Sequence, residues 1–325
     1  MPSESAIKVS GLTKSYGELL AVDHISFEVK RGEIFGFLGP NGAGKTTTIN
    51  VLTGVTKPTS GTAKISGFDV TSRPRKAKEL VGVVPEIMYL YAEMTVWENI
   101  NFSAKLHNMP KERRTGTARE LLHLFGLYEK RDQRVDTLSR GMKQCLMIAT
   151  ALVHQPDILF LDEPTTGLDV QGARQIRDLI KELNRKGTTV FLTTHYIEEA
   201  DQLCQRIAIL NKGQIVTVGT PEELKSSAQT EQTIEVSFDH EVVTDQLERL
   251  SGVKKVISNG DKFKLYVQNP PDTLPLIFSF ADENRLKVTS INTLKPTLED
   301  AFVELTGLGP EIMTMEKQHK GASGG

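Results

Sequence analysis

The sequence predicts an α/β protein, in which a mostly parallel sheet carries a helical insert and antiparallel N-terminal strands, followed by a small α+β domain. Three observations predict this fold class. A glycine-rich phosphate-binding pattern lies between an apolar stretch of strand length and a helical stretch. Short apolar strands then alternate with helices, as in parallel sheets covered on both faces. After a polar stretch, the order becomes β-α-β-β-α-β, which is typical of ferredoxin-like domains.

The phosphate-binding pattern G-x-x-x-x-G-K-[ST] is matched at every fixed position by Gly39-Pro40-Asn41-Gly42-Ala43-Gly44-Lys45-Thr46-Thr47. Glycines let successive backbone N–H groups surround a phosphate chain, and a helix expected from Thr47 onward would present its positive end. We expect Lys45 to reach the β and γ phosphates of a nucleotide and the Thr46 hydroxyl to hold Mg²⁺. A chance match is disfavoured, because an apolar strand, residues 34–38, comes directly before the loop.

The elements around this loop are short. Tyr16 lies between two expected strands, where its ring could stack on an adenine or pack on the sheet, and the residue alone does not decide. The strand at 81–84 ends at Glu86. The expected elements before the insert are strands at 6–10 and 24–30, a strand and turn at 61–70, and a helix starting at 73–78.

Residues 90–153 are expected to form the helical insert. Thr95 and Glu98 have the spacing of a capping box, which marks a helix start. A second helix is expected at about 111–125, and Ser139 can cap a third helix that runs to about residue 153.

Strands return after the insert, and acidic residues follow the first of them. Residues 158–161 lead into Asp162 and Glu163, and residues 189–192 lead through Thr193 and Thr194 into His195. An aspartate at this place can orient the Mg²⁺ shell beside a phosphate loop, and the next glutamate can polarise an attacking water. The alternative, a strand that simply exits into solvent, is less common for two adjacent acids. A helix at about 171–185 and a hairpin around residues 211–213 complete the expected sheet.

A second domain is expected from composition and pattern. The nucleotide-binding domain should cover residues 1–225, followed by a linker at 226–232, an accessory domain at 233–308 and a disordered tail at 309–325. The hairpin signal at residues 259–261 supports the ferredoxin-like order of the accessory domain.

Bulk composition narrows the class of protein. The 325 residues carry 39 Lys and Arg against 41 Asp and Glu, a net charge of −2, so nucleic acid is not an expected partner. No run of about 18 apolar residues could span a membrane, and the N-terminus lacks an apolar signal core, which indicates the cytosol. Cys145 and Cys204 are far apart in sequence and are expected to be free, buried thiols.

A phosphate-binding loop occurs in several classes of protein, and one further stretch distinguishes among them. This stretch is Leu138-Ser139-Arg140-Gly141-Met142-Lys143-Gln144. Here the sequence resembles the ATP-binding cassette (ABC) family, whose signature usually reads LSGGQ. Ser139 and Gly141 match, whereas Arg140 and Met142 depart from the pattern. The resemblance implies that Ser139 and Gly141 grip the γ-phosphate held by another subunit's phosphate loop.

The resemblance covers about residues 1–225 and assigns further roles. Tyr16 stands where the family has an adenine-stacking aromatic residue, and His195 stands where it has the switch histidine. Residues 167–169 correspond to the loop that communicates across the dimer. Glu163 is implied as the catalytic base, with Lys45 and His195 beside it, and Asp162 as a Mg²⁺ residue. Glu86 stands where the family usually has a glutamine near Mg²⁺, so nucleotide binding or coupling should be altered.

A single cassette implies a dimer, either a homodimer or one with a second ABC subunit, with two ATP and Mg²⁺ at the interface. The trailing domain and the variant signature resemble export ATPases of the daunorubicin-resistance type, whose integral membrane permease is a separate chain. The chain would then lie on the inner face of the cell membrane. Apolar residues 87–91 and Trp97 could meet the permease, although about half of them are expected to be buried in the core of the insert. The alternative is a soluble ABC ATPase with an assembly or regulatory role, which copurification with a membrane protein would distinguish.

Overall fold

The computed structural model describes residues 5–227, 232–240, 242–260, 262–294 and 296–308. The described residues form two compact units, one ending at Pro221 and one running from Glu222 to Leu308. The expected disordered tail at 309–325 lies outside the described residues, and so does most of the expected linker at 226–232.

A six-stranded sheet forms the centre of the first unit, in the order β10-β9-β3-β8-β7-β6. All neighbours are parallel except β9 and β10, which form the expected hairpin. The sheet is therefore mostly parallel, and its buried strands are continuous apolar runs. Its strands are β3 (Ile34–Leu38), β6 (Val81–Val84), β7 (Ile158–Asp162), β8 (Thr189–Thr194), β9 (Arg206–Asn211) and β10 (Gln214–Gly219).

A second, antiparallel sheet has the order β2-β1-β4-β5. Its first two strands are longer than the sequence predicts, because the register shifts between Val9 and Leu12 around Gly11, whose φ is +56°. Such a bulge interrupts the alternation of apolar and polar residues, so the pattern is lost although the strand continues. The strands are β1 (Ser5–Tyr16), β2 (Leu19–Lys30), β4 (Ser60–Ile65) and β5 (Phe68–Asp69).

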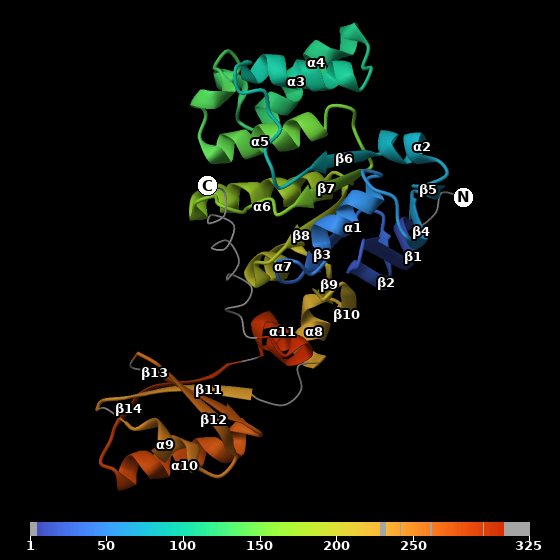
Figure 1. Cartoon of the computed structure of the whole chain (residues 1–325). Coiled ribbons are helices and arrows are strands. Elements are labelled where there is room, and N and C mark those ends of the chain that lie inside the picture. Colours follow the sequence, from blue (N-terminus) through green and yellow to red (C-terminus); the bar gives the residue numbers. More distant parts are fainter. Residues whose placement is uncertain (1–4, 228–231, 241, 261, 295, 309–325) are drawn as a thin grey trace, which may run out of the picture. The chain divides into compact units, whose positions relative to one another are not determined.

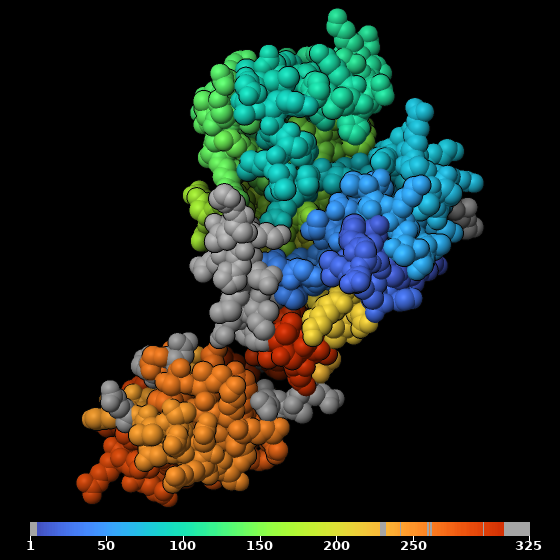
Figure 2. Space-filling model, in the orientation of Figure 1, coloured from blue at the N-terminus to red at the C-terminus, as the bar shows by residue number. Residues whose placement is uncertain are grey.

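The insert is helical, as expected, and its three helices pack together into a lobe of the first unit (Figures 1 and 2). They are α3 (Val96–Leu106), α4 (Lys111–Leu124) and α5 (Arg140–Ala151). The capping box at Thr95 and Glu98 is confirmed, and Ser139 caps α5 by accepting from the N–H of Met142. The other helices of the first unit are α1 (Lys45–Leu52), α2 (Pro74–Glu79), α6 (Val170–Arg185) and α7 (Ile197–Leu203), and α8 (Pro221–Ser227) begins at the division between the two units.

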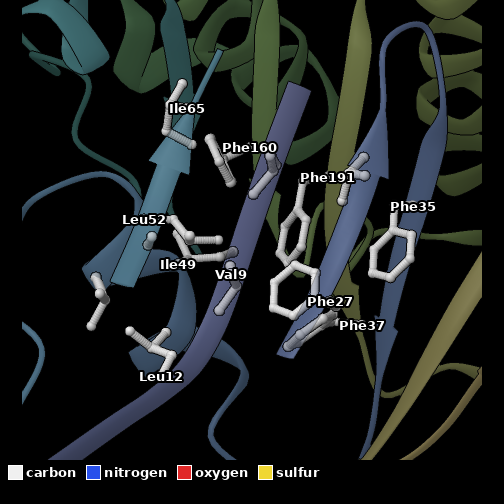
Figure 3. Close-up of a cluster of buried hydrophobic side chains, with 14 of the residues drawn as sticks. Val9, Leu12, Phe27, Phe35, Phe37, Ile49, Leu52, Ile65, Phe160 and Phe191 are labelled. Carbon is white, nitrogen blue, oxygen red and sulfur yellow. The ribbon is translucent and has the colours of Figure 1, made fainter. Parts of the chain in front are cut away.

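Aromatic side chains fill the core between the two sheets (Figure 3). Phe27 of β2 packs against Phe37 of β3 with ring centroids 4.9 Å apart, and Phe37 lies at the same distance from Phe191 of β8. Burial of such rings contributes a few kcal/mol each and fixes β3 and β8 side by side. The carboxyl ends of β3, β7 and β8 are thereby held at one edge, where Lys45, Asp162, Glu163 and His195 lie.

The second unit has the expected ferredoxin-like order, with an antiparallel sheet β12-β13-β11-β14. Apolar residues from alternate strand positions pack with α9 and α10 into a core of their own, which includes Val236, Leu265 and Ile277. Thr297 caps the last helix with a second capping box. The elements are β11 (Gln232–Phe238), α9 (Thr244–Glu248), β12 (Val253–Asn259), β13 (Lys262–Val267), α10 (Pro270–Glu283), β14 (Val288–Leu294) and α11 (Leu298–Thr306).

Two further expectations concern the whole chain. Cys145 and Cys204 are buried and free, as expected. In the part of the chain that the structure describes, none of the helices combines the length and apolar character needed to cross a bilayer.

Candidate active site

The phosphate loop connects β3 to α1, and its glycines are required by close approaches. A Cβ atom at Gly39 would lie 2.6 Å from the carbonyl oxygen of Leu210, and one at Gly44 would lie 2.5 Å from that of Ala21. Gly44 also has φ +100°, a region that L side chains rarely adopt. No side chain caps α1, which begins at Lys45, two residues earlier than expected. The N-terminal N–H groups of α1 therefore fit an anion.

Lys45 is buried within this loop. Its Nζ donates to the carbonyl oxygens of Gly39, at 2.7 Å, and Pro40, at 3.2 Å. The same nitrogen lies 3.2 Å from Oε1 of Glu163, and both side chains are only 6% exposed. The ammonium group is thus held at the loop, where a phosphate group would meet it.

Asp162 ends β7 beside the loop. Its Oδ1 accepts from the hydroxyl of Thr46, at 3.3 Å, and from that of Thr193 at the end of β8. Burial raises the pKa of Asp162, and the charges of Glu163 and Glu86 act in the same direction. A carboxylate and a hydroxyl at one point are the oxygen ligands that Mg²⁺ prefers, so Asp162 and Thr46 fit this ion.

Glu163 is held in an unusual backbone conformation, with φ +53°. Such strain in a residue other than glycine persists only where the surroundings enforce it, and it is common at functional sites. Here the N–H of Glu163 donates to the backbone oxygen of Thr193, at 3.1 Å, and to its hydroxyl, at 3.2 Å. These bonds turn the side chain toward Lys45 and His195.

The two carboxylate oxygens of Glu163 have different environments. Oε2 accepts from His195 through Nδ1, at 2.8 Å, and through the backbone N–H, at 3.3 Å, and from the hydroxyl of Thr166, at 3.4 Å. Oε1 is buried and accepts no hydrogen bond within the described residues, although the Lys45 ammonium lies 3.2 Å away. One oxygen is therefore fixed, and the other keeps its acceptor capacity.

The charge state of Glu163 follows from opposing effects. Burial raises its pKa, but the hydrogen bond with His195 and the charge of Lys45 outweigh burial, and the net pKa is lowered. The carboxylate is thus ionised at neutral pH. Because an ionised carboxylate can only accept, the Nδ1 atom of His195 carries the hydrogen of their bond.

Other expected site residues lie apart from this cluster. Tyr16 is 47% exposed at the end of β1, with the ammonium of Lys14 lying 4.7 Å from its ring centroid. In the described parts of the chain, no hydrogen bond or ion pair joins Ser139 or Gly141 to the phosphate loop. Glu86 is exposed after β6, and its charge is felt at Asp162.

The structure adds two threonines that the motifs did not identify. Thr193 pairs with Asp162 in the parallel register of β7 and β8, so a correct alignment of the two strand ends would have predicted their contact. Thr166 lies in a turn that returns to Glu163, with its N–H donating to the Glu163 carbonyl at 3.2 Å. No pattern in the sequence pointed to Thr166.

The chain belongs to the family of ABC transporter ATP-binding proteins. Residues 22–166 match the ABC transporter domain, and residues 219–306 match the C-terminal domain of DrrA1-3-like ATP-binding proteins. The linearmycin resistance ATP-binding protein LnrL of Bacillus subtilis is 34% identical over 305 residues, which cover 93% of this chain and 98% of LnrL.

Two further relatives match over nearly the whole chain. The Nod factor export ATP-binding protein I of Paraburkholderia xenovorans is 38% identical, over 94% of this chain and 98% of that protein. The daunorubicin/doxorubicin resistance ATP-binding protein DrrA of Streptomyces peucetius is 36% identical, over 93% of this chain and 92% of DrrA.

A solved structure extends the likeness to the fold. A dimeric ATP-binding cassette in a post-hydrolysis state, bound to ADP and Pi, has a TM-score of 0.60 and 29% identity, and the match covers 66% of this chain and 98% of that one. The first unit is therefore an ATP-hydrolysing cassette, and ATP is its substrate.

Proposed function

We propose that this chain uses ATP hydrolysis to power export through a separate integral membrane permease. The observation that carries the proposal is the position of Glu163, which is held between Lys45 and His195 with one carboxylate oxygen still able to accept. The names of the relatives, two for drug resistance and one for export, support the direction of transport.

The phosphate loop supplies binding. In this structure Lys45 donates hydrogen bonds to loop carbonyls. When ATP binds, its ammonium group would contact the β and γ phosphates instead. The N–H groups of Gly42, Gly44 and Thr47 would donate to the same phosphates at the turn into α1, whereas the Ala43 N–H donates to the Pro40 carbonyl at 3.2 Å. The Tyr16 ring is 47% exposed and would stack on the adenine.

Mg²⁺ would be held by Thr46 and Asp162, with Glu86 approaching it, and when bound it neutralises charge that develops on the phosphates. Burial disfavours the ionised form of Asp162, so a cation at this place would favour that form.

Glu163 is the general base of the proposed reaction. Its Oε1 accepts a proton from the attacking water, while His195 and Thr166 hold Oε2 and so fix the direction of the carboxylate. The His195 side chain is 13% exposed. Its Nδ1 atom bonds Glu163, so Nε2 remains to contact the γ-phosphate. A positioned base of this kind contributes about 10²–10⁴-fold to rate.

A second subunit completes the proposed site. Ser139 and Gly141 lie at the N-terminal end of α5, where the helix dipole favours an anion, but they make no bond to their own phosphate loop. Two chains with two-fold symmetry would place each signature against the other chain's ATP, as a homodimer or with a second ABC subunit.

An apolar surface after β6 supports a permease partner. Ile87 is 80% exposed, and Met88, Tyr89 and Tyr91 are between 38% and 47% exposed, whereas Trp97 is half-buried. Consecutive exposed apolar residues of this kind mark an interaction site. The chain would then lie on the inner face of the cell membrane through its permease.

The catalytic part of the proposal is tested by Glu163→Gln. We expect the ATPase rate to fall by at least about a hundredfold, because the base is lost, while ATP binding is retained. Rates are measured with the purified chain, and binding by titration with ATP. A Glu163→Gln chain that hydrolyses ATP at the wild-type rate would remove Glu163 from the mechanism.

The transport part is tested by purification from membranes in a gentle detergent. An integral membrane protein should copurify with the wild-type chain, and Ile87→Asp should weaken this association without changing the ATPase rate of the isolated chain. If no membrane protein copurifies, a soluble role in assembly or regulation becomes the better proposal.

A further inference from the structure

Arg140 is the first residue of α5, at the place where the family's signature usually has glycine. Its Nη2 donates to the carbonyl oxygen of Thr166, at 3.2 Å. The guanidinium group also covers Gly167, since it overlaps the position that a Cβ atom there would take. The side chain therefore lies on residues 166–167 of its own chain.

The segment under Arg140 is directly connected to the catalytic base. Thr166 donates its hydroxyl to Oε2 of Glu163, at 3.4 Å, and its N–H to the Glu163 carbonyl, at 3.2 Å. Two successive hydrogen bonds thus run from the Arg140 guanidinium through Thr166 to the Glu163 carboxylate. Both belong to one chain.

We propose that Arg140 is a positioning residue, which ties the signature end of α5 to Thr166 and through Thr166 holds Glu163 in place for hydrolysis. This inference rests on the proposed dimer, in which Ser139 and Gly141 contact the ATP of the other chain. Arg140 then links that contact to the base of its own site, so that each ATP favours hydrolysis of the other.

Arginine suits this role for a physical reason. Its planar guanidinium can stack flat on the glycine and donate to the carbonyl at the same time, whereas a lysine ammonium is a point charge without a flat face. Gly167 has φ +73° and must remain without a side chain on two accounts, its backbone conformation and the room that Arg140 needs. The glycine of the usual signature could make neither contact.

The test measures kcat and KM of the full chain for Arg140→Gly, Thr166→Val and the double variant. Loss of a charged hydrogen bond should lower kcat about tenfold in Arg140→Gly, with KM within about twofold of wild type. Because both residues act on Glu163 through one connection, the double variant should be no slower than the slower single variant, within about twofold. Arg140→Lys should restore only part of kcat.

Lys143→Ala is the matched control. Lys143 lies one turn further along α5 and also donates to a carbonyl, that of Asp136 at 3.1 Å. Among the described residues, no hydrogen bond or ion pair joins Asp136 to Glu163. Its kcat should stay at the wild-type value. The inference is overturned by an unchanged kcat in Arg140→Gly, by an equal loss in Lys143→Ala, or by losses that multiply in the double variant.

A sedimentation experiment separates this inference from the proposed dimer. Glu163→Gln and Arg140→Gly/Glu163→Gln chains should form the same ATP-dependent dimer, because Arg140 acts on Glu163 and not on assembly. If Glu163→Gln alone stays monomeric with ATP, the proposed dimer fails. If only the double variant is monomeric, Arg140 serves assembly and the positioning role is wrong.

Discussion

Glu86 differs from the neighbouring acidic residues, because it is exposed whereas Asp162 and Glu163 are buried. Its charge contributes to the raised pKa of Asp162, so the two carboxylates repel each other. Both would face the same cation and phosphate groups. A negative charge at this place should therefore weaken binding of the anionic nucleotide unless Mg²⁺ neutralises it.

Substitution of Glu86 tests this electrostatic account. Glu86→Gln should lower the KM for ATP a few-fold and shift the Mg²⁺ dependence of the ATPase rate, because repulsion near the phosphates is removed. Glu93→Gln, at an exposed acid in the insert, is the control and should change neither value. Identical Mg²⁺ curves for Glu86→Gln and wild type would contradict the account.

At the residue scale, the sequence predicted which side chains lie together at the phosphate loop, but not all of their contacts. Lys45, Asp162, Glu163 and His195 follow from motifs, because a strand end and a glycine loop fix where each side chain must lie. The partner of Arg140 could not be predicted, because the direction of a long side chain depends on the packing of residues 26 positions away. In this structure the contacts of Arg140 are with Thr166 and Gly167 of its own chain.

The junction of the helical insert with the sheet contains a stacked pair of histidine rings, of which His107 is exposed and His154 is partly buried. His107, which follows α3, stacks on His154, which follows α5, with ring centroids 3.8 Å apart and planes 4° apart. His154 Nε2 meets the Val81 carbonyl of β6 at 3.0 Å, and Nδ1 is buried without a partner in the described residues. Burial, and next the nearby His107, lower the pKa of His154 to about 4.

This pair predicts a loss of stability in mild acid. The pKa of His154 is about 4 in the folded chain and about 6.5 when unfolded, so the unfolded state binds more protons between these pH values. The free energy of unfolding should therefore fall as pH decreases from 7 to 5, by about 1 kcal/mol after allowance for the partial exposure of the ring. Chemical unfolding at both pH values measures the change.

His154→Gln keeps a donor for the Val81 carbonyl but cannot be protonated, so it should lose less stability between pH 7 and 5. His123→Gln, at an exposed histidine of the insert, is the control and should behave as the wild type. An equal pH dependence in His154→Gln and wild type would show that the acid sensitivity has another origin.

At the element scale, predictions failed where a local irregularity interrupts a pattern. β1 was expected to end at residue 10 and reaches Tyr16, because the bulge at Gly11 changes the face of the following residues. α1 begins at Lys45 because Gly44 takes the left-handed conformation needed to start it there. Long helices and buried strands without such irregularities, such as α6 and β7, lie within one residue of their expected bounds.

The two units have separate cores, and this predicts the effect of truncation. The apolar core between the two sheets of the first unit contains no residue beyond Val218, and that of the second unit begins at Ile234. Deletion of residues 230–325 should leave ATP binding intact and weaken dimer formation or coupling to the permease. Titration with ATP checks this, with full-length Lys45→Ala as the chain that should not bind, and loss of ATP binding on truncation would contradict it.

For the whole molecule, the central claim is that each ATP site needs two chains. Lys45→Ala and Ser139→Glu should each be inactive alone, because the first removes a phosphate contact and the second places a charge against the opposite ATP. Each site combines Lys45 of one chain with Ser139 of the other, so the two substitutions affect different halves of a site. A mixed dimer therefore retains one site in which both halves are intact.

The ATPase rate of an equal mixture of these two variants is the most direct measurement. If sites form between chains, about half of the dimers in the mixture contain one chain of each variant. Each of these mixed dimers has one intact site out of two, so the mixture should recover up to about a quarter of the wild-type rate. If Ser139 served the site of its own chain, or no site, the mixture would be no faster than the average of the two separate variants.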